Sequence, residues 1–118
     1  MFKALFAAAV IAAVIAVPAF ARSSATTLKG QAGPGFSIEL TKAGKKVKTL
    51  KAGTYKIKVE DKGSIHNFHL TGPGVNKSTT IPFTGEKTWT VKLKPGKYTY
   101  QCDIHASQGM KGSFKVTK

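Results

Sequence analysis

Short alternating segments that end at glycine or proline constrain the fold of this 118-residue chain more than any other feature. Residues 54–60 alternate between apolar and charged side chains, with Tyr55, Ile57 and Val59 in the apolar set. A period of two places alternate side chains on opposite faces of a β-strand. From Leu28 onward no stretch of helical length shows the period of an α-helix. The chain is therefore predicted to be all-β.

Seven or eight short strands are expected after Leu28, with turn residues between them. The clearest of them cover residues 37–41, 47–50, 54–60, 65–71, 86–93, 98–102 and 111–117. The segment Gly72-Pro73-Gly74 is predicted to open a long polar loop that runs to Ile81. Many short strands in a chain of this size predict an antiparallel β-sandwich of two sheets.

Residues 1–21 have the features of a cleaved secretory signal peptide. Lys3 supplies a positive start, residues 4–17 are uniformly apolar, and Ala19-Phe20-Ala21 is typical of a cleavage site. A membrane anchor is the alternative, but spanning a bilayer takes about 20 apolar residues. We therefore expect a mature domain at residues 22–118, exported to the periplasm or the cell exterior, with no stable membrane insertion.

The charge and the rare residues exclude several classes of function. Lys and Arg number 19 against 5 Asp and Glu, and the chain has one Cys. One Cys excludes an internal disulfide and a four-cysteine zinc site, and few carboxylates argue against a carboxylate cage. The net charge of +14 favours transient association with an acidic protein. Nucleic acid is a poor fit because no recognition helix is predicted, and a monomer is the default expectation.

The chemistry concentrates in one segment near the C-terminus. Cys102, His105 and Met110 have the spacing C-x2-H-x4-M, on the loop before the last predicted strand. Two further histidines, His66 and His69, lie on a separate strand. One thiolate, two imidazoles and one thioether form the mixed nitrogen and sulfur set that a blue-copper electron-transfer site requires.

His66 and His69 compete for the place of the upstream ligand. Three positions apart on the predicted strand 65–71, they point to opposite faces, so only one of them reaches the metal. His66 shares its face with Phe68, and we therefore favour His66 and interpret His69 as a structural or surface histidine. Asp103, inside the ligand loop, is expected to be a solvated carboxylate.

The stretch from Tyr100 to Gly112 (YQCDIHASQGMKG), together with His66-Asn67, resembles the plastocyanin-like branch of the cupredoxins. The resemblance implies a Greek-key β-sandwich with one type 1 copper per chain. Its ligands would be the two histidines, the cysteine and the methionine already singled out: His66, Cys102, His105 and Met110. Asn67 matches a position that helps to hydrogen-bond the sulfur and to pin the loop. The chain departs from the family at Ile104, where proline is common, and in its basic surface.

The resemblance also implies a function. The chain is expected to be an exported, soluble carrier of single electrons that cycles between Cu(II) and Cu(I), and not an enzyme. The exposed edge of His105, beside small residues such as Ala106, would be the electron port. A periplasmic copper chaperone or storage protein with the same ligands is the alternative. It ranks lower because the mature chain has no Met-rich or His-rich tract.

Overall fold

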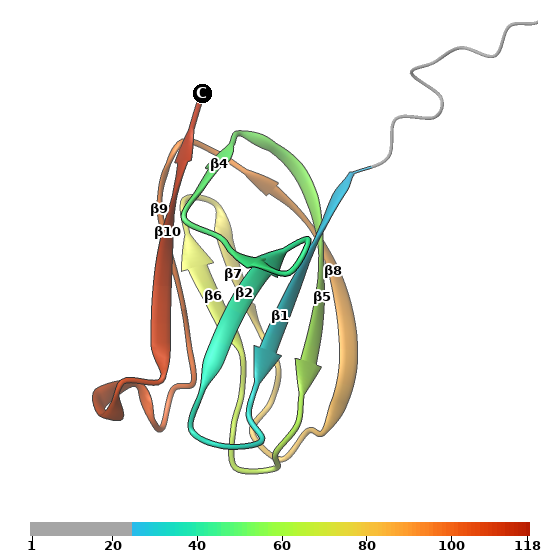
Figure 1. Cartoon of the computed structure of the whole chain (residues 1–118), viewed down its shortest axis with the longest axis vertical. Helices are drawn as coiled ribbons and strands as arrows, with labels where there is room; N and C mark the ends of the chain where they lie inside the picture. Colours follow the sequence, from blue (N-terminus) through green and yellow to red (C-terminus); the bar gives the residue numbers. More distant parts are fainter. Residues whose placement is uncertain (1–24) are drawn as a thin grey trace, which may run out of the picture.

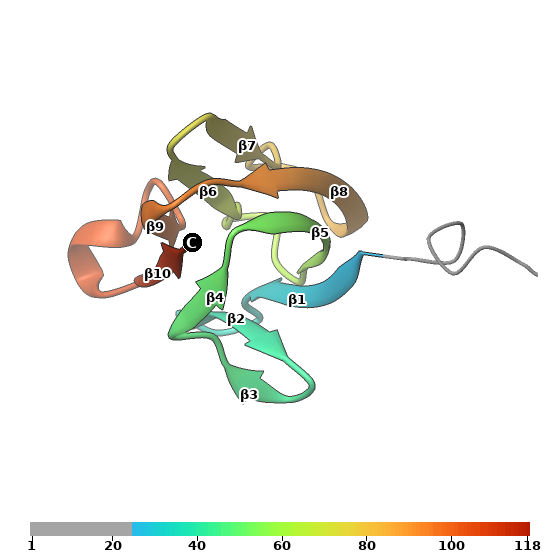
Figure 2. The same ribbon diagram turned by 90° about the horizontal axis from the view of Figure 1, so that it is seen from above.

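The computed structural model describes residues 25–118, which form two packed sheets of five strands each (Figures 1 and 2). The first sheet has the order β3-β2-β1-β5-β8 and the second the order β4-β10-β9-β6-β7. The strands of the first sheet are β1 (Thr26–Ala32), β2 (Ile38–Lys42), β3 (Lys45–Lys46), β5 (Gly53–Asp61) and β8 (Gly85–Leu93). Those of the second are β4 (Thr49–Lys51), β6 (His69–Gly72), β7 (Val75–Ser78), β9 (Gly96–Gln101) and β10 (Lys111–Thr117). The predicted β-sandwich is confirmed.

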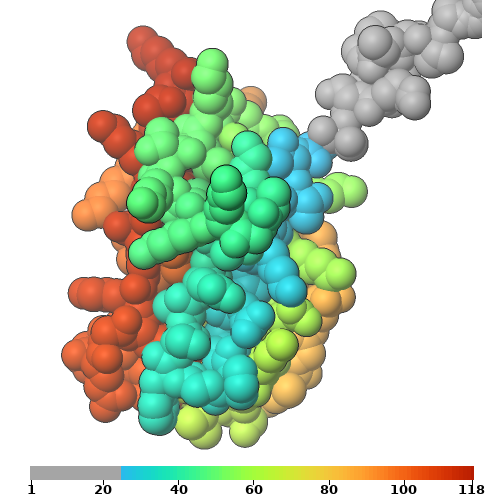
Figure 3. Space-filling view, viewed as in Figure 1, coloured from blue at the N-terminus to red at the C-terminus, as the bar shows by residue number. Residues whose placement is uncertain are grey.

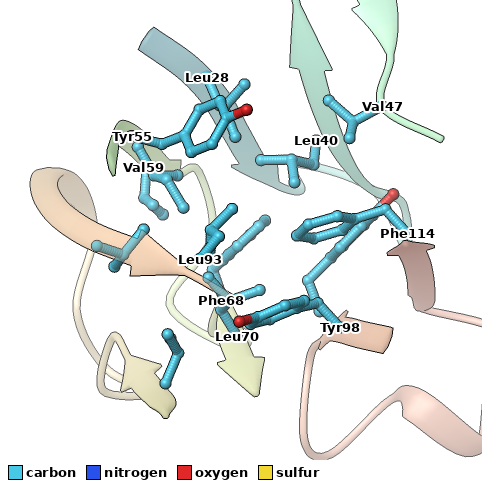
Figure 4. Close-up of a cluster of buried hydrophobic side chains, with 14 of the residues drawn as sticks. Leu28, Leu40, Val47, Tyr55, Val59, Phe68, Leu70, Leu93, Tyr98 and Phe114 are labelled. Atoms are coloured by element: carbon cyan, nitrogen blue, oxygen red, sulfur yellow. The ribbon is translucent and has the colours of Figure 1, made fainter. Parts of the chain in front are cut away.

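An apolar core fills the space between the two sheets (Figure 4). The alternation in β5 buries Tyr55, Ile57 and Val59 and leaves the lysines between them exposed, as the period-two pattern predicts. Aromatic rings from β9 and β10 fill much of the second sheet's inner face. Tyr98 stacks on Phe114 with ring centroids 5.3 Å apart and an interplanar angle of 11°. Such burial of large aromatic surfaces is a main source of folding free energy.

Two features of the sheets correct the sequence prediction. The described residues contain ten strands rather than seven or eight, because β1, β3 and β7 have no counterpart among the predicted ranges. β3 and β7 have only two and four residues, and the buried positions of β1 include Gly30 and Ala32, which give a weak apolar signal. The sheets are also mixed rather than purely antiparallel. β1 pairs with β5 in parallel, and β10 pairs with β4 in parallel. Both pairings join strands that are distant in sequence, and local patterning carries no information about such pairs.

Two local predictions were wrong. Residues 65–68 lie in a turn and an irregular segment, so the strand expected at 65–71 begins only at His69. The residues after Gly72 do not open a long loop. They turn tightly, with Gly74 at φ 72°, and β7 pairs antiparallel with β6. Glycine adopts this left-handed conformation without steric cost, which is what the tight connection requires.

The loops that follow β1, β5, β7 and β9 all lie at one end of the sandwich, the lower end in Figure 1. This end contains all the buried polar side chains of the described residues, namely Asp61, His66, Asn67 and Thr79. The sandwich therefore has one polar end built on an apolar body.

The predicted signal peptide at residues 1–21 lies outside the described residues. In the part of the chain from residue 25 onward, no helix has the length and apolar character needed to cross a membrane.

Candidate metal centre

The predicted metal-binding side chains come from two loops at the polar end. His66 lies in the turn between β5 and β6, and Cys102 directly follows β9. His105 precedes the short 3₁₀ helix η2 (Ala106–Gln108), and Met110 directly precedes β10. Two adjacent antiparallel strands therefore hold both ends of the loop that carries Cys102, His105 and Met110.

Backbone hydrogen bonds close this loop on itself. The amide of Cys102 donates to the carbonyl of Met110 at 3.0 Å, and the amide of Met110 donates to the carbonyl of His105 at 3.2 Å. The amide of His105 in turn donates to the carbonyl of Cys102 at 3.1 Å. Gly109 ends η2 at φ 95°, a left-handed conformation that favours glycine. The three residues thus have a fixed backbone relation to one another.

The donor atoms of His66, Cys102 and His105 converge on one point. The two histidine Nδ1 atoms are 3.2 Å apart, and the sulfur of Cys102 lies 3.4 Å from Nδ1 of His105 and 3.9 Å from Nδ1 of His66. Metal bonds of about 2.0 Å to nitrogen and about 2.3 Å to sulfur in a trigonal plane require separations of about 3.5 Å and about 3.7 Å. The three atoms therefore fit a single metal ion.

Burial strengthens this fit. His66 and Cys102 are fully buried, and Met110 is 1% exposed. Nε2 of His66 has no hydrogen-bond partner among the described residues, so nothing there orients this ring through its outer nitrogen. The ring is instead confined sterically. A Cβ at Gly33 or Gly63 would come within 2.8 Å or 2.9 Å of its Cδ2 atom. A buried cluster of nitrogen and sulfur lone pairs is costly unless a cation binds it.

Phe36 covers the site from outside, which sequence reasoning did not anticipate. Its ring makes edge-on contacts with His105 at 4.7 Å and with His66 at 5.6 Å between centroids. Yet it remains 64% exposed, and Ile65 and Ile104, which directly precede the two histidines in the chain, are each 51% exposed. An isolated phenylalanine between glycine and serine was the only available signal. We call these three exposed side chains the apolar rim: Phe36 contacts the partly exposed His105, Ile104 directly precedes His105 in the chain, and Ile65 directly precedes His66.

Asn67 and Asp103 tie the two ligand loops together. The amide of Asp103 donates to Oδ1 of Asn67 at 2.8 Å, and Nδ2 of Asn67 donates to the Asp103 carboxylate at 2.9 Å. Nδ2 of Asn67 also donates to Ser78 Oγ at 3.1 Å. We call the reciprocal pair the Asn67–Asp103 clasp. Because each residue directly follows a histidine or cysteine of the donor cluster, the clasp fixes the spacing between the two loops.

His69 is not part of the donor cluster but supports the clasp from outside. Its Nδ1 lies 2.9 Å from the Asp103 carboxylate and its Nε2 lies 2.7 Å from Oδ1 of Asn76. Gln101 donates to the same carboxylate at 3.0 Å. Asp103 is exposed, as the predicted solvated carboxylate would be, but the sequence did not predict its hydrogen-bond partners. It accepts bonds from three side chains because the strand register places His69 opposite Gln101.

These contacts shift the pKa values of the pair in opposite directions. Burial lowers the pKa of His69, but the hydrogen bonds to Asp103 and Asn76 outweigh it, so the net pKa is raised. Burial raises the pKa of Asp103, but the hydrogen bonds from His69, Asn67 and Gln101 outweigh it and the net pKa is lowered. Both shifts favour the charged ion pair.

A second set of hydrogen bonds fixes the loop that carries His66. Thr79 Oγ1 accepts from the amide of Phe68 at 2.9 Å and donates to the Asp61 carboxylate at 3.3 Å. The same carboxylate accepts from the amide of Gly63 at 3.1 Å. Burial raises the pKa of Asp61 despite these bonds. This series of hydrogen bonds thus connects β5 of the first sheet to the second sheet on both sides of His66.

Comparison with known proteins identifies the chemistry of this end. Residues 20–117 match the family model described as copper binding proteins, plastocyanin/azurin family. No curated protein sequence matches the chain.

Among solved structures, the chain is similar to reduced rusticyanin, with 26% identity, a TM-score of 0.58 and coverage of 80% of this chain and 82% of that one. Rusticyanin from Thiobacillus ferrooxidans gives 27% identity and a TM-score of 0.53, with 80% and 79% covered. Reduced auracyanin from Roseiflexus castenholzii gives 18% identity and a TM-score of 0.58 over 81% of this chain and all of that one, a likeness of fold alone. The resemblance to the cupredoxins and the expected copper cofactor are thus confirmed, and the chain belongs to the plastocyanin/azurin family of copper-binding proteins.

Proposed function

We propose that this chain is an exported type 1 copper protein that carries single electrons between redox partners and catalyses no reaction of its own. Membership of the copper-binding family gives the coarse function, blue copper electron transfer. The single observation that carries the assignment to residues is the convergence of His66, Cys102 and His105 on one point. Met110, buried and hydrogen-bonded through its backbone to Cys102 and His105, is proposed as the fourth residue that would hold the metal.

Copper would supply the change of oxidation state, with sulfur ligands favouring Cu(I) and imidazoles accepting Cu(II). The protein's own contribution is to keep the donor atoms in place. The closed loop from Cys102 to Met110 and the Asn67–Asp103 clasp oppose movement of the ligands. Donors that move little between the two oxidation states keep the reorganisation energy low. Phe36 and the burial of His66 limit the access of water.

His105 is proposed as the electron port because it is the only one of the four proposed ligands that is more than marginally exposed. Phe36 and Ile104 of the apolar rim lie directly beside it, and both are exposed. A weakly polar contact surface permits close approach without a large desolvation cost. The partner is expected to be an acidic protein that binds transiently, because the chain has a formal charge of +14.

The test is a titration of the mature chain, residues 22–118, with Cu(II). We expect one intense blue band that saturates at one copper per chain, disappears with ascorbate and returns with an oxidant. Cys102→Ser should abolish the band. The matched histidine pair tests the upstream ligand: His66→Ala should abolish the blue site, and His69→Ala should leave it nearly intact.

The opposite result for the two histidines would overturn the proposed ligand set. A pale complex in the wild type would overturn the electron-carrier function. If a blue complex releases copper to a Cu(I) chelator faster than it exchanges electrons, the chaperone or storage function becomes the better explanation.

A further inference from the structure

The acidic residues of the chain are distributed unequally between the two sheets. Four of the five belong to strands of the first sheet, namely Glu39, Glu60, Asp61 and Glu86. The strands of the second sheet contain none, although they carry five lysines. The fifth carboxylate, Asp103, is held by His69 at the polar end.

Ion pairs follow the same division. Among residues 25–118, the lysine ion pairs are Lys29–Glu60 at 3.1 Å and Lys58–Glu86 at 3.5 Å, and both lie on the outer face of the first sheet. No lysine in the described part of the second sheet has a carboxylate partner. The positive charge of the second sheet is therefore unneutralised by the chain itself.

Part of this charge borders a cleft of about 470 Å³ that lies over β9 and β10 of the second sheet. Four lysines line this cleft, Lys46, Lys48, Lys97 and Lys115, together with Gly96, Ser113 and the edge of Phe114. No acidic residue lines it. Lys46 ends β3 of the first sheet, and Lys48 lies between β3 and β4. In Figure 3 this segment lies beside the red C-terminal strand, and the amide of Lys115 donates to the carbonyl of Lys48 at 3.0 Å. We call this surface the lysine cleft.

The register of β9 and β10 places two of these lysines directly opposite each other, because Lys97 pairs with Lys115. Like charges in opposed positions of an antiparallel pair destabilise the sheet. Lys46 and Lys48 add to the same positive field from the neighbouring segment. The opposed lysines therefore lower the stability of the sheet, and an anionic ligand bound between them would remove this repulsion.

We propose that the lysine cleft is the docking site for an acidic segment of a protein partner. The cleft is open and is lined by the stems of its lysines and the edge of Phe114, which suits an extended peptide with carboxylates better than a small inorganic anion. Its positive groups are all lysines, which act as hydrated point charges, whereas phosphate recognition favours the bidentate fork of arginine. Lysine–carboxylate contacts at a surface are weak and exchange quickly. This is the behaviour that a transient partner requires.

The location of the lysine cleft separates docking from the proposed electron port. Lys97 lies near the start of β9 and Cys102 directly follows its end, about 17 Å along the strand. A partner bound at the cleft would leave the apolar rim beside His105 free for the redox contact. In this respect the inference rests on the proposed function and adds a second contact surface to it.

The test is a titration of ¹⁵N-labelled, copper-free protein with a short poly-glutamate peptide, followed by amide chemical shifts. We expect the shifts to cluster at Lys46, Lys48, Lys97, Ser113 and Lys115 and to fade as salt is added. Lys97→Glu/Lys115→Glu should weaken binding about tenfold or more. The control, Lys56→Glu/Lys92→Glu, makes the same change of charge on neighbouring strands of the first sheet and should weaken it about twofold or less.

Stability supplies a second readout. Lys115→Glu places a carboxylate opposite Lys97, so it should raise the melting temperature while it weakens peptide binding. If the double variant does not fold, Lys97→Gln/Lys115→Gln replaces it. Equal loss of binding in both double variants, or shifts spread over both sheets, would reduce the effect to net charge and overturn the proposal. Inorganic phosphate that binds the same residues as tightly would also overturn it.

Because the titration uses copper-free protein, it is independent of the metal. Cys102→Ser should bind the peptide as tightly as the wild type. Peptide binding at the lysine cleft without a blue site would overturn the electron-carrier function alone. A blue site without such binding would overturn the docking proposal alone.

Discussion

The apolar body and the polar end of the sandwich are stabilised in different ways. The apolar body, represented by Tyr98 and Phe114, is held by stacked and interdigitated side chains whose contacts are numerous and non-directional. The polar end is held by a small number of directional hydrogen bonds, among them the Asn67–Asp103 clasp. The body can lose a contact and stay the same shape, whereas the geometry of the polar end depends on each bond. Stability and ligand geometry are therefore largely separate properties of this chain.

The largest expected effect comes from a large-to-small substitution in the apolar body. Phe114→Ala removes a ring that stacks on Tyr98 and lies 6.3 Å from Tyr100, and it should lower the free energy of unfolding by about 3–5 kcal/mol. Chemical denaturation of the copper-free protein measures this change. The molecules that remain folded should bind copper with an unchanged visible spectrum. A changed spectrum would show that the body and the polar end are not separate.

An intermediate effect is expected from Asn67→Ala, which breaks the clasp. It leaves the Asp103 amide and carboxylate without their partners on Asn67 and should cost about 1–3 kcal/mol in the copper-free protein. Unlike Phe114→Ala, it should also alter the visible and electron paramagnetic resonance spectra, because the spacing of the two ligand loops changes. Ser78→Ala is the matched control, since it removes only one outer bond to Asn67. Equal spectral changes in both variants would contradict the role of the clasp.

A smaller effect on stability is expected from the His69–Asp103 ion pair, which supports the clasp from outside. The His69 and Asp103 side chains are 24% and 40% exposed, so their interaction should be worth about 0.2–1 kcal/mol. A double-mutant cycle with His69→Ala and Asp103→Asn isolates this coupling. A coupling well above this range would place the pair among the main supports of the polar end.

The smallest expected effect is the pH dependence of the same pair. The raised pKa of His69 gives stability that is complete at low pH and is lost as pH rises through that pKa, above the ordinary 6.5. The lowered pKa of Asp103 gives stability that is present above the ordinary 3.8 and is lost as pH falls through the lowered value. The difference in unfolding free energy between wild type and His69→Ala should therefore be greatest between these limits.

Taking the difference between the two proteins removes the contribution of Asp61, whose pKa is raised and whose titration is common to both. Urea unfolding of the copper-free proteins at several pH values provides the curve. A difference that stays constant from pH 3 to pH 9 would show that the pair is not ionised in the folded chain.

The sequence predicted the body of the molecule well because its signals are local. Alternation located the buried faces of β5 and β9, and the C-x2-H-x4-M spacing located the ligand loop. The same information could not place Asp103 or Phe36. The bonds of Asp103 depend on the register between β6 and β9, and the contacts of Phe36 depend on how two distant loops meet. Inter-strand register and loop approach are non-local, so no spacing within a single segment reports them.

The choice between His66 and His69 illustrates the difference between local and non-local signals. The prediction relied on alternation along a strand that does not extend to His66. Even so, the structure places the two side chains differently: His66 is fully buried, whereas His69 is partly exposed. The backbone turns before β6 begins and directs His66 inward, while His69 faces outward at the first position of the strand. The interpretation of His69 as a structural histidine agrees with its contacts, but the reason for it was wrong.

The placement of β10 has a consequence for biosynthesis. This last strand is an interior member of the second sheet and joins β9 to β4, which lies in the first half of the sequence. The donor residues after β9 acquire their fixed spacing only when β10 closes the loop. A nascent or proteolytically shortened chain that stops before Lys111 has neither this strand nor a complete second sheet. We therefore expect a chain that stops before Lys111 not to bind copper in the native geometry.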